Sequence, residues 1–520
     1  MGFYEEIIDA VLSGKIKDAD SLQKEKQRLA KKYGLQNIPS NVDILMHADP
    51  SVRKKLSLLV KKPTRTLSGV SVIAVMTKPL PCPGRCIYCP RGDAAQSYTG
   101  QEPAALRAKQ NVFDPYRQTL ARLRQLEASG HPTDKVEVIV MGGTFTSAPV
   151  DYQEDFVKGI FDALNGVKAA NLEEAHEINQ SSEHRCVGLT FEIRPDYCSR
   201  EDIKRMLTYG GTRVELGVQT IYNDIYEKIM RDHTVEDVIR ATKDLKDSAF
   251  KVCYHLMPGL PYSSRDRDLA MFKEIFTNPS FMPDMLKIYP TLLAREEFYS
   301  DKTIWDLYKR GEWKPLTNEE AVDLLAEAMR FVPKWVRIMR MQRDIPARLI
   351  AAGVTAGNLR ELVYAKAKEK GIDVKEIRAR EVGIRQREGF DIGEPELVKE
   401  EYEASGGKEV YIAFEDDNET LFGFLRLRKP GKPFIEWAKN AAFIRELHVY
   451  GPEAEIGEKS GAKIQHRGLG ERLVKTAEEI ALDWGFKKII VISGVGVRPY
   501  YKKLGYYKHG PYMAKDLASN

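Results

Sequence analysis

Three closely spaced cysteines are the residues that most clearly point to chemistry. Cys82, Cys86 and Cys89 stand in the segment CPGRCIYC, with three residues between the first pair and two between the second. Three thiolates on one short loop can hold three irons of a [4Fe–4S] cube and leave the fourth iron without a protein ligand. A structural zinc site is the alternative, but it needs a fourth ligand and usually two separated pairs.

The cysteine spacing resembles that of radical S-adenosylmethionine enzymes, in which the open iron binds the cofactor and reduction releases a 5′-deoxyadenosyl radical. In these enzymes the aromatic residue before the last cysteine packs beside the cofactor, and Tyr88 holds that place; an ordinary buried tyrosine is the alternative. Met141-Gly142-Gly143-Thr144 resembles the glycine motif that meets the methionine amino group, since glycine lets backbone approach a ligand closely. The family often has Glu where this chain has Thr144. The resemblance implies S-adenosylmethionine contacts at Gly142 and Gly143, with a plain turn as the alternative.

A second candidate site lies near the C-terminus. The segment QHRGLG (465–470) opens a strongly amphipathic helix pattern over 470–484. A glycine-rich turn before a helix presents free N–H groups to a pyrophosphate, which fits coenzyme A, whereas a simple helix start is the alternative. The Q-x-x-G-x-G pattern resembles the pyrophosphate loop of GNAT-type acetyltransferases, in which the preceding strand splays and binds the pantetheine arm. This resemblance implies acetyl-CoA contacts at Glu446, Leu447, His448, Val449, Gly468, Leu469, Gly470 and Glu471.

A pair of tyrosines follows the next predicted strand, in ISGVGVRPYYKKLGY (492–506). Tyr501 stands where GNAT-type enzymes often have a tyrosine near the thioester sulfur, so we expect it to contact acetyl-CoA and to act as a catalytic residue. A phenol with a pKa near 10 can protonate a leaving thiolate. Tyr500 is the alternative donor, and aromatic core packing is the alternative for either residue.

The elements that must position these residues form an alternating pattern. Six β-rich runs, at 70–78, 136–142, 186–192, 213–219, 251–257 and 286–290, alternate with helical patterns such as those at 114–129, 199–210, 237–247 and 266–276. Such alternation implies parallel strands joined by right-handed crossovers. We therefore expect an α/β protein with a partial (βα)6 barrel over 67–330. In parallel barrels the loops after the strand C-termini carry the chemistry, which places the cysteines and the two glycines at one mouth.

The segments before and after the predicted barrel have different sequence patterns from the barrel. Residues 1–66 read as a basic helical region, with helical spacing in 3–12 and 42–60. Residues 331–400 read as a connection, with an extra strand in 335–346 and a helix over 356–371. Residues 401–520 read as a separate GNAT-type α/β domain. A length of 520 residues agrees with roughly three domains.

Composition excludes several classes of protein. The chain is 43% hydrophobic and 30% charged, and it contains no apolar run near the roughly 20 residues of a membrane span. Six cysteines are too few for a disulfide framework, and the first 20 residues lack a secretory signal. We therefore expect a cytoplasmic protein without membrane contact. The net charge is only +5, yet residues 51–70 hold six Lys or Arg and no acid, which is either a solvated helix face or a nucleic-acid contact.

The two halves together resemble the family of catalytic tRNA acetyltransferase subunits of Elongator, in their stand-alone archaeal or bacterial form. The resemblance runs nearly end to end and includes QSYTGQEP (96–103), FEIRPDYC (191–198), QRDIPARLI (342–350) and VISGVGVRPYYKKLGY (491–506). Eukaryotic members have a longer gap between the first two cysteines, whereas this chain has the compact spacing of a working cluster.

The resemblance implies a complete reaction. Acetyl-CoA would lend its methyl carbon to C5 of the wobble uridine in a tRNA anticodon, with the adenosyl radical abstracting hydrogen from that methyl and thioester hydrolysis leaving a carboxymethyl group. It also implies an acetyl-CoA contact at Lys135, for which a solvated strand-end charge is the alternative. The basic segment 51–70 and the N-terminal lysines would contact tRNA phosphates. The protein would act as a stand-alone monomer or a homodimer.

Two rival functions stay open at this point. A protein lysine acetyltransferase would need a base and a peptide groove but no radical. A tRNA-binding assembly subunit would carry its cluster only for structure. The intact glycine loop and the count of three cysteines argue against both, because a structural cluster normally has four protein ligands.

Overall fold

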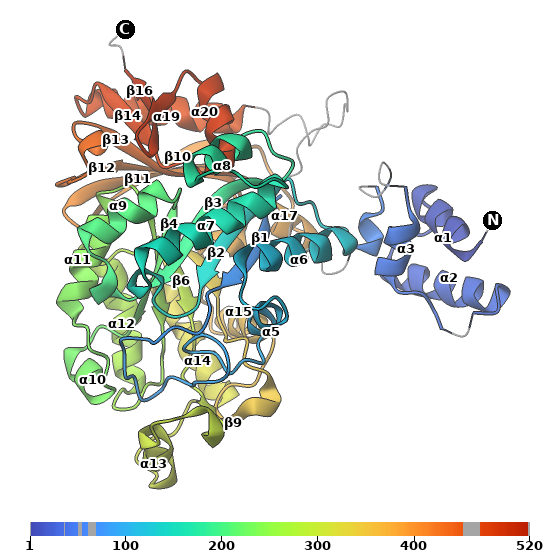
Figure 1. Cartoon of the computed structure of the whole chain (residues 1–520), viewed down its shortest axis with the longest axis horizontal. Coiled ribbons are helices and arrows are strands. Elements are labelled where there is room, and N and C mark those ends of the chain that lie inside the picture. Colours follow the sequence, from blue (N-terminus) through green and yellow to red (C-terminus); the bar gives the residue numbers. More distant parts are fainter. Residues whose placement is uncertain are drawn as a thin grey trace.

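The chain forms three parts that follow one another along the sequence (Figure 1). The computed structural model describes residues 2–35, 37–49, 52, 55–60, 69–450 and 468–517. Within these residues no helix combines the length and apolarity that crossing a bilayer requires. In Figure 1 the N-terminal helices project beside α6, and the C-terminal sheet lies against one end of the central sheet.

The N-terminal part consists of three helices around a small core. They are α1 (Phe3–Leu12), α2 (Ala19–Lys32) and α3 (Asn41–His47). The Asp18 and Ser40 side chains accept N–H bonds at the starts of α2 and α3, as good N-caps do. The predicted helix over 3–12 is confirmed. Among the described residues of 42–60, the structure has α3 and a short turn at Ser57–Leu59, and α2 lies within the region predicted to be helical, although no helix was predicted at its position. Most of the basic segment 51–70 lies outside the described residues.

The central part is a parallel sheet of seven strands in the order β1-β2-β3-β4-β5-β6-β8. The strands are β1 (Ser71–Met76), β2 (Lys135–Met141), β3 (Arg185–Ile193), β4 (Arg213–Gln219), β5 (Lys251–Leu256), β6 (Met285–Ile288) and β8 (Arg337–Arg340). The six predicted strands are confirmed. The extra strand expected in 335–346 is β8, which pairs with β6 and makes the partial barrel seven-stranded.

The connections between these strands are helical, and most of their helices cover the outer face of the sheet, as crossover connections require. The helices are α5 (Pro103–Gln110), α6 (Pro115–Ala128), α7 (Val150–Asn165), α8 (Leu172–Asn179), α9 (Arg200–Thr208), α10 (Asn223–Lys228), α11 (Val235–Lys246) and α12 (Arg265–Thr277). Outward strand residues such as Val138, Val140 and Phe191 belong to the apolar core beneath these helices. Alternate residues point inward, so the lumen receives Glu137, Arg213, Glu215 and Lys287 instead.

A connecting region follows β6. It contains β7 (Leu293–Ala294), β9 (Ile350–Ala352), α13 (Thr303–Lys309), α14 (Asn318–Ala328), α15 (Leu359–Glu369), α16 (Ile377–Arg380) and α17 (Val382–Arg387). The helix predicted over 356–371 is α15. Because β8 completes the first sheet, residues 331–400 are part of the folded core and more than a linker.

The C-terminal part is a second sheet, in the order β10-β11-β12-β13-β14-β16-β15. Its elements are β10 (Glu396–Ala404), β11 (Gly407–Glu415), β12 (Leu421–Lys429), β13 (Ala442–Val449), α19 (Leu469–Asp483), β14 (Lys488–Val491), α20 (Arg498–Lys503), β15 (Tyr507–His509) and β16 (Tyr512–Asp516). The boundary expected at residue 401 falls inside β10, so this sheet begins earlier than the sequence indicated. Strands β10, β15 and β16 were not predicted.

The second sheet packs on the amino ends of the barrel strands. A Cβ on Gly496 would lie 2.5 Å from the Arg185 side chain at the start of β3, and the Tyr512 hydroxyl donates to Ser248 just before β5 at 3.0 Å. Arg445 of β13 donates to Asp284, just before β6. The cysteines follow β1 at the opposite, carboxyl end of the barrel. The lumen therefore lies between the two predicted sites.

Candidate active site

The three cysteines gather in one cavity at the carboxyl end of the barrel. Cys82, Cys86 and Cys89 all line it, together with Gly143 after β2 and Arg194 after β3. Each sulfur accepts an N–H donor: Gly84 N to Cys82 at 3.4 Å, Arg231 Nη1 to Cys86 at 3.5 Å, and Gln96 Nε2 to Cys89 at 3.3 Å. Donors to sulfur stabilise thiolates, so this donor set fits an iron–sulfur cluster held by three ligands.

The same cavity contains buried polar atoms that lack a partner among the described residues. They are the Tyr88 hydroxyl, Nη1 of Arg194 and Oε1 of Gln219. Unpartnered buried polar groups are costly and call for an explanation. A polar ligand such as S-adenosylmethionine, with its carboxylate, amino and ribose groups, supplies both donors and acceptors. The cavity therefore fits the cofactor that the cysteine spacing predicts.

The two glycines after β2 have the backbone freedom expected of a ligand-binding turn. Gly142 and Gly143 have φ angles of +126° and +90°, which side-chain-bearing residues rarely adopt. A Cβ on Gly142 would lie 2.3 Å from the Thr77 hydroxyl, so Gly142 serves close packing. Gly143 and Thr144 line the cavity. Gly143 is thus the glycine that the fold presents to a ligand.

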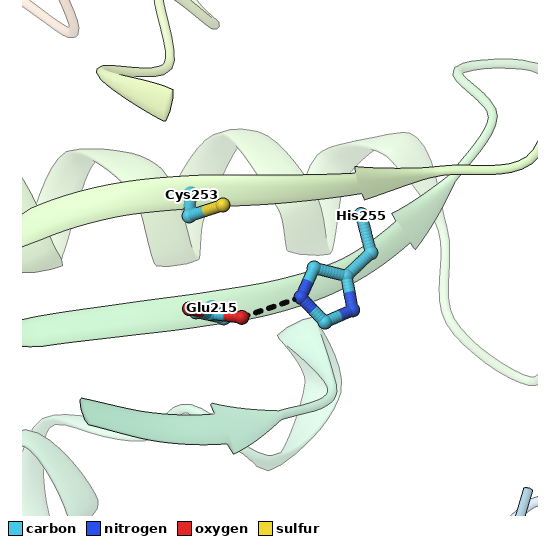
Figure 2. Close-up of side chains that lie close together, drawn as sticks. All are labelled: Glu215, Cys253 and His255. Atoms are coloured by element: carbon cyan, nitrogen blue, oxygen red, sulfur yellow. Dashed lines mark hydrogen bonds and ion pairs between the residues drawn. The ribbon is translucent and has the colours of Figure 1, made fainter. Parts of the chain in front are cut away.

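Part of the wall of this cavity is a buried, paired charge network, of which Figure 2 shows the hydrogen bond between Glu215 and His255. The Glu215 carboxylate accepts from Nε2 of His255 at 2.7 Å and from Arg213 Nε at 3.2 Å, and it contacts the Lys287 ammonium. Burial alone would raise the pKa of Glu215, but Lys287 and the His255 hydrogen bond hold it well below its usual value. Glu215, Cys253 and His255 lie close enough to bind a metal. Because Lys287 and Arg213 already neutralise the carboxylate, we interpret the group as a polar lumen wall.

The C-terminal sheet opens where the acetyl-CoA arm was predicted. Strand β13 pairs with β14 only at Ala442–Ile444, and the strands diverge from Arg445 onward. The first turn of α19 begins at Gly468, with φ +87° and no side-chain cap, so its N–H groups can bind a pyrophosphate. A Cβ on Gly470 would lie 3.6 Å from Val449, which brings β13 and α19 together.

The remaining predicted contacts divide between the two faces of β13. Leu447 and Val449 pack toward the domain core, whereas Glu446 and His448 line a cavity shared with the barrel. Leu469 is the buried first residue of α19, and Glu471 is exposed on the first turn of that helix. Gln465, His466 and Arg467 lie outside the described residues.

The two tyrosines occupy different environments. Tyr501 is only 5% exposed and belongs to the apolar core, with its ring edge-on to those of Tyr500 and Tyr506. The Tyr500 hydroxyl lies beside the α19 N-terminus, because a Cβ on Gly470 would come within 2.8 Å of it. The structure thus brings Tyr500 directly to the predicted pyrophosphate site and sets Tyr501 one layer behind it.

Lys135 lies at the boundary between the two sheets. It begins β2 and pairs in register with Arg185, whose side chain contacts Gly496 of the C-terminal part. This position agrees with a contact across the domain boundary.

Sequence reasoning missed three residues of the cysteine cavity. Arg194 directly follows β3 and Gln219 ends β4, so a search of polar residues at strand C-termini finds them. Arg231 follows α10 and reaches Cys86 across 145 residues, a contact that no local pattern signals.

Comparison with known families also divides the chain into an N-terminal, a central and a C-terminal part. Family models match residues 1–67 ("ELP3 N-terminal domain"), 81–274 ("Radical SAM superfamily"), 283–369 ("Radical_SAM C-terminal domain") and 377–506 ("Acetyltransferase (GNAT) family"). The three cysteines lie within the radical SAM match, and Glu446 and Tyr501 lie within the acetyltransferase match.

Full-length relatives are similar along nearly the whole chain. The tRNA uridine(34) acetyltransferase of Methanocaldococcus jannaschii is 50% identical, over 99% of this chain and 97% of its own length. Human Elongator complex protein 3 is 43% identical, over 99% of this chain and 96% of its own length. The structure of Methanocaldococcus infernus Elp3 lacking residues 1–46 superposes with a TM-score of 0.77 at 47% identity, covering 87% of this chain and 100% of that one.

Proposed function

This chain belongs to the family of tRNA uridine(34) acetyltransferases and Elongator complex protein 3, and from that premise we propose that it forms a carboxymethyl group at C5 of the wobble uridine of tRNA. It is an acyltransferase with a radical S-adenosylmethionine barrel and a GNAT domain. The proposed substrates are acetyl-CoA and the anticodon of tRNA. We expect the reaction to take place in the cytoplasm.

Each part of the chain has a proposed task. Cys82, Cys86 and Cys89 hold the [4Fe–4S] cluster, and Gly143 meets S-adenosylmethionine. When bound, these two groups supply the radical that activates the acetyl methyl carbon. The chain itself binds acetyl-CoA through β13, the α19 N-terminus and Lys135, and excludes water from the cavity. No strongly basic side chain is required, because the protein's task is placement.

The observation that carries this proposal is the cysteine cavity, in which three donor-stabilised sulfurs and three unpartnered polar atoms face one space among the described residues. The test is anaerobic: reconstituted protein, tRNA, ¹³C-labelled acetyl-CoA and S-adenosylmethionine, followed by nucleoside mass spectrometry. We expect labelled carboxymethyluridine that requires both small molecules. Acetylation of a peptide without S-adenosylmethionine would support the rival lysine acetyltransferase instead.

Replacement of Tyr501 by phenylalanine tests the proposed proton donor. Burial raises the pKa of Tyr501 well above its usual value, so the phenol stays protonated at neutral pH. If its proton goes to the leaving thiolate, Tyr501→Phe should slow release of free coenzyme A by about 10²-fold. A thiol reagent measures this release. Tyr500→Phe is the matched comparison, and a slower release in that variant alone would transfer the role to Tyr500.

Removal of the N-terminal part tests its proposed tRNA contacts. Residues 3–59 enclose their own apolar core, so we expect the barrel to fold without them. Deletion of residues 1–60 should weaken tRNA binding. It should also make the salt dependence shallower: the negative slope of the logarithm of the binding constant against log salt should decrease in magnitude by about 0.7–0.9 for each phosphate that the N-terminal part neutralises. Fluorescence anisotropy with labelled tRNA at several salt concentrations measures both. Replacing the exposed Lys17, Lys24 and Lys31 by glutamine should reproduce part of the effect; an unchanged slope in both variants would place the tRNA contacts elsewhere.

A further inference from the structure

A second cavity joins the two candidate sites through the barrel. It begins at Glu446 and His448 on β13, at the amino end of the barrel. It continues along the lumen past Ile139, and it shares Met141 and Lys287 with the cysteine cavity. The lumen is therefore hollow between the acetyl-CoA strand and the pocket that contains the cysteines.

The entrance of this cavity faces away from the pyrophosphate side of β13. Val449 contacts Gly470 of α19, whereas His448 points to the lumen side. Nε2 of His448 is buried without a partner among the described residues. Burial lowers the pKa of His448 to about 4, so its imidazole is neutral at physiological pH. An uncharged polar group at this point suits a polar, uncharged thioester carbonyl.

Lys287 is one of the cations that line both cavities. The Lys287 ammonium donates to Glu192 at 3.1 Å and contacts Glu215. An ammonium has three N–H donors, so two carboxylates leave one for another acceptor. Lys287 lines both cavities, and that third donor is suited to a carbonyl or carboxylate oxygen.

We propose that the barrel lumen is the internal route by which the two-carbon acyl end of the coenzyme A thioester reaches the cysteine cavity, with Lys287 binding its oxygen on the way. This inference rests on the proposed function. It explains how sites at opposite ends of the barrel serve one reaction, because the C-terminal sheet closes the amino end over the lumen and leaves β13 facing into it.

Filling the lumen is the first test. Ile139→Trp and Met339→Trp add bulk to inward positions of β2 and β8 that line only the second cavity. We expect carboxymethyluridine formation to fall at least tenfold, while calorimetric acetyl-CoA affinity and iron content stay within about twofold of the unmodified protein. Ile139→Leu and Met339→Leu conserve volume and should keep full activity. Full activity in both tryptophan variants would overturn the route and leave the proposed function intact. If the unmodified protein forms no carboxymethyluridine, that result would count against the proposed function itself.

Affinity labelling is the second test, and it needs no turnover. A cysteine introduced by Met339→Cys should displace bromide from bromoacetyl-coenzyme A, forming a carbon–sulfur bond that peptide mass spectrometry locates. Glu201→Cys, at an exposed position of α9, is the matched control. Its thiol should react with bromoacetamide and should show no preference for bromoacetyl-coenzyme A over bromoacetamide. If bromoacetamide modifies the thiol introduced in the lumen and bromoacetyl-coenzyme A does not, the route is contradicted.

Discussion

Cys86→Ala is expected to abolish carboxymethyluridine formation while leaving acetyl-CoA binding intact. Cys86 is only 8% exposed and lies between the other two cysteines, where its sulfur accepts from Arg231 at 3.5 Å. Removing one of three ligands leaves two, too few to hold a cube that already has an open iron. We expect the iron content of the reconstituted protein to fall from about four atoms per chain toward zero. Colorimetric iron analysis, electron paramagnetic resonance and nucleoside mass spectrometry measure these changes.

Cys186→Ala provides the matched control. Cys186 is also buried, but it packs in the apolar core of the barrel, and burial raises its thiol pKa to about 12. We expect this variant to keep the full iron content and activity. Undiminished product formation in Cys86→Ala would remove the radical mechanism, and a stable zinc ion in place of iron would do the same.

The barrel was predictable from the sequence because its signals are local. Buried parallel strands such as β2, with Val136, Val138 and Val140 facing the helices, form apolar runs that stand out between amphipathic helices. Strand β10 was missed for the opposite reason. It reads ELVKEEYEA, its residues are mostly exposed, and only pairing with β11 makes it a strand.

The candidate sites divide in the same way. The cysteines, Gly142 and Gly143 could be proposed from the sequence because they lie in one short motif or directly after a strand. Arg231 and the lumen network were not, because Glu215, His255 and Lys287 come from three different strands and carry no common spacing. The sequence also could not show which of Tyr500 and Tyr501 is more deeply buried. The two residues are adjacent, and only the packing of α20 against α19 makes their environments different.

A buried network of eight charges fixes the C-terminal sheet on the barrel. The acids are Asp247, Asp284, Glu409 and Glu446, and the cations are Lys246, Arg426, Arg428 and Arg445. Asp284 is at its centre, accepting from Arg445 Nη1 at 2.8 Å, Lys246 at 3.2 Å and Val252 N at 2.8 Å. Because Arg426 also binds Glu446 of β13, this network sets the position of β13 over the lumen.

Asp284→Asn is therefore expected to lower the free energy of unfolding by about 3–5 kcal/mol, since it leaves Arg445 and Lys246 buried without their anion. Chemical denaturation measures this loss. Burial alone would raise the pKa of Asp284, but Arg445 and Lys246 hold it well below its usual value of about 4. A carboxylate with a depressed folded-state pKa stabilises the fold fully above the unfolded pKa and loses that contribution as pH falls below it. The unmodified protein should thus lose stability steeply below about pH 4, and Asp284→Asn should lose less over the same range.

Two comparisons separate this network from general surface electrostatics. Glu201→Gln removes an exposed pair with Lys204 and should change the unfolding free energy by less than about 0.5 kcal/mol. Combining Asp284→Asn with Arg445→Met should cost less than the sum of the single changes, because the second substitution removes the cation that the first one strands. Strict additivity in that cycle, or a pH profile identical to that of the unmodified protein, would mean that Asp284 does not anchor the interface. Weaker acetyl-CoA binding in Asp284→Asn would connect the same network to the position of β13.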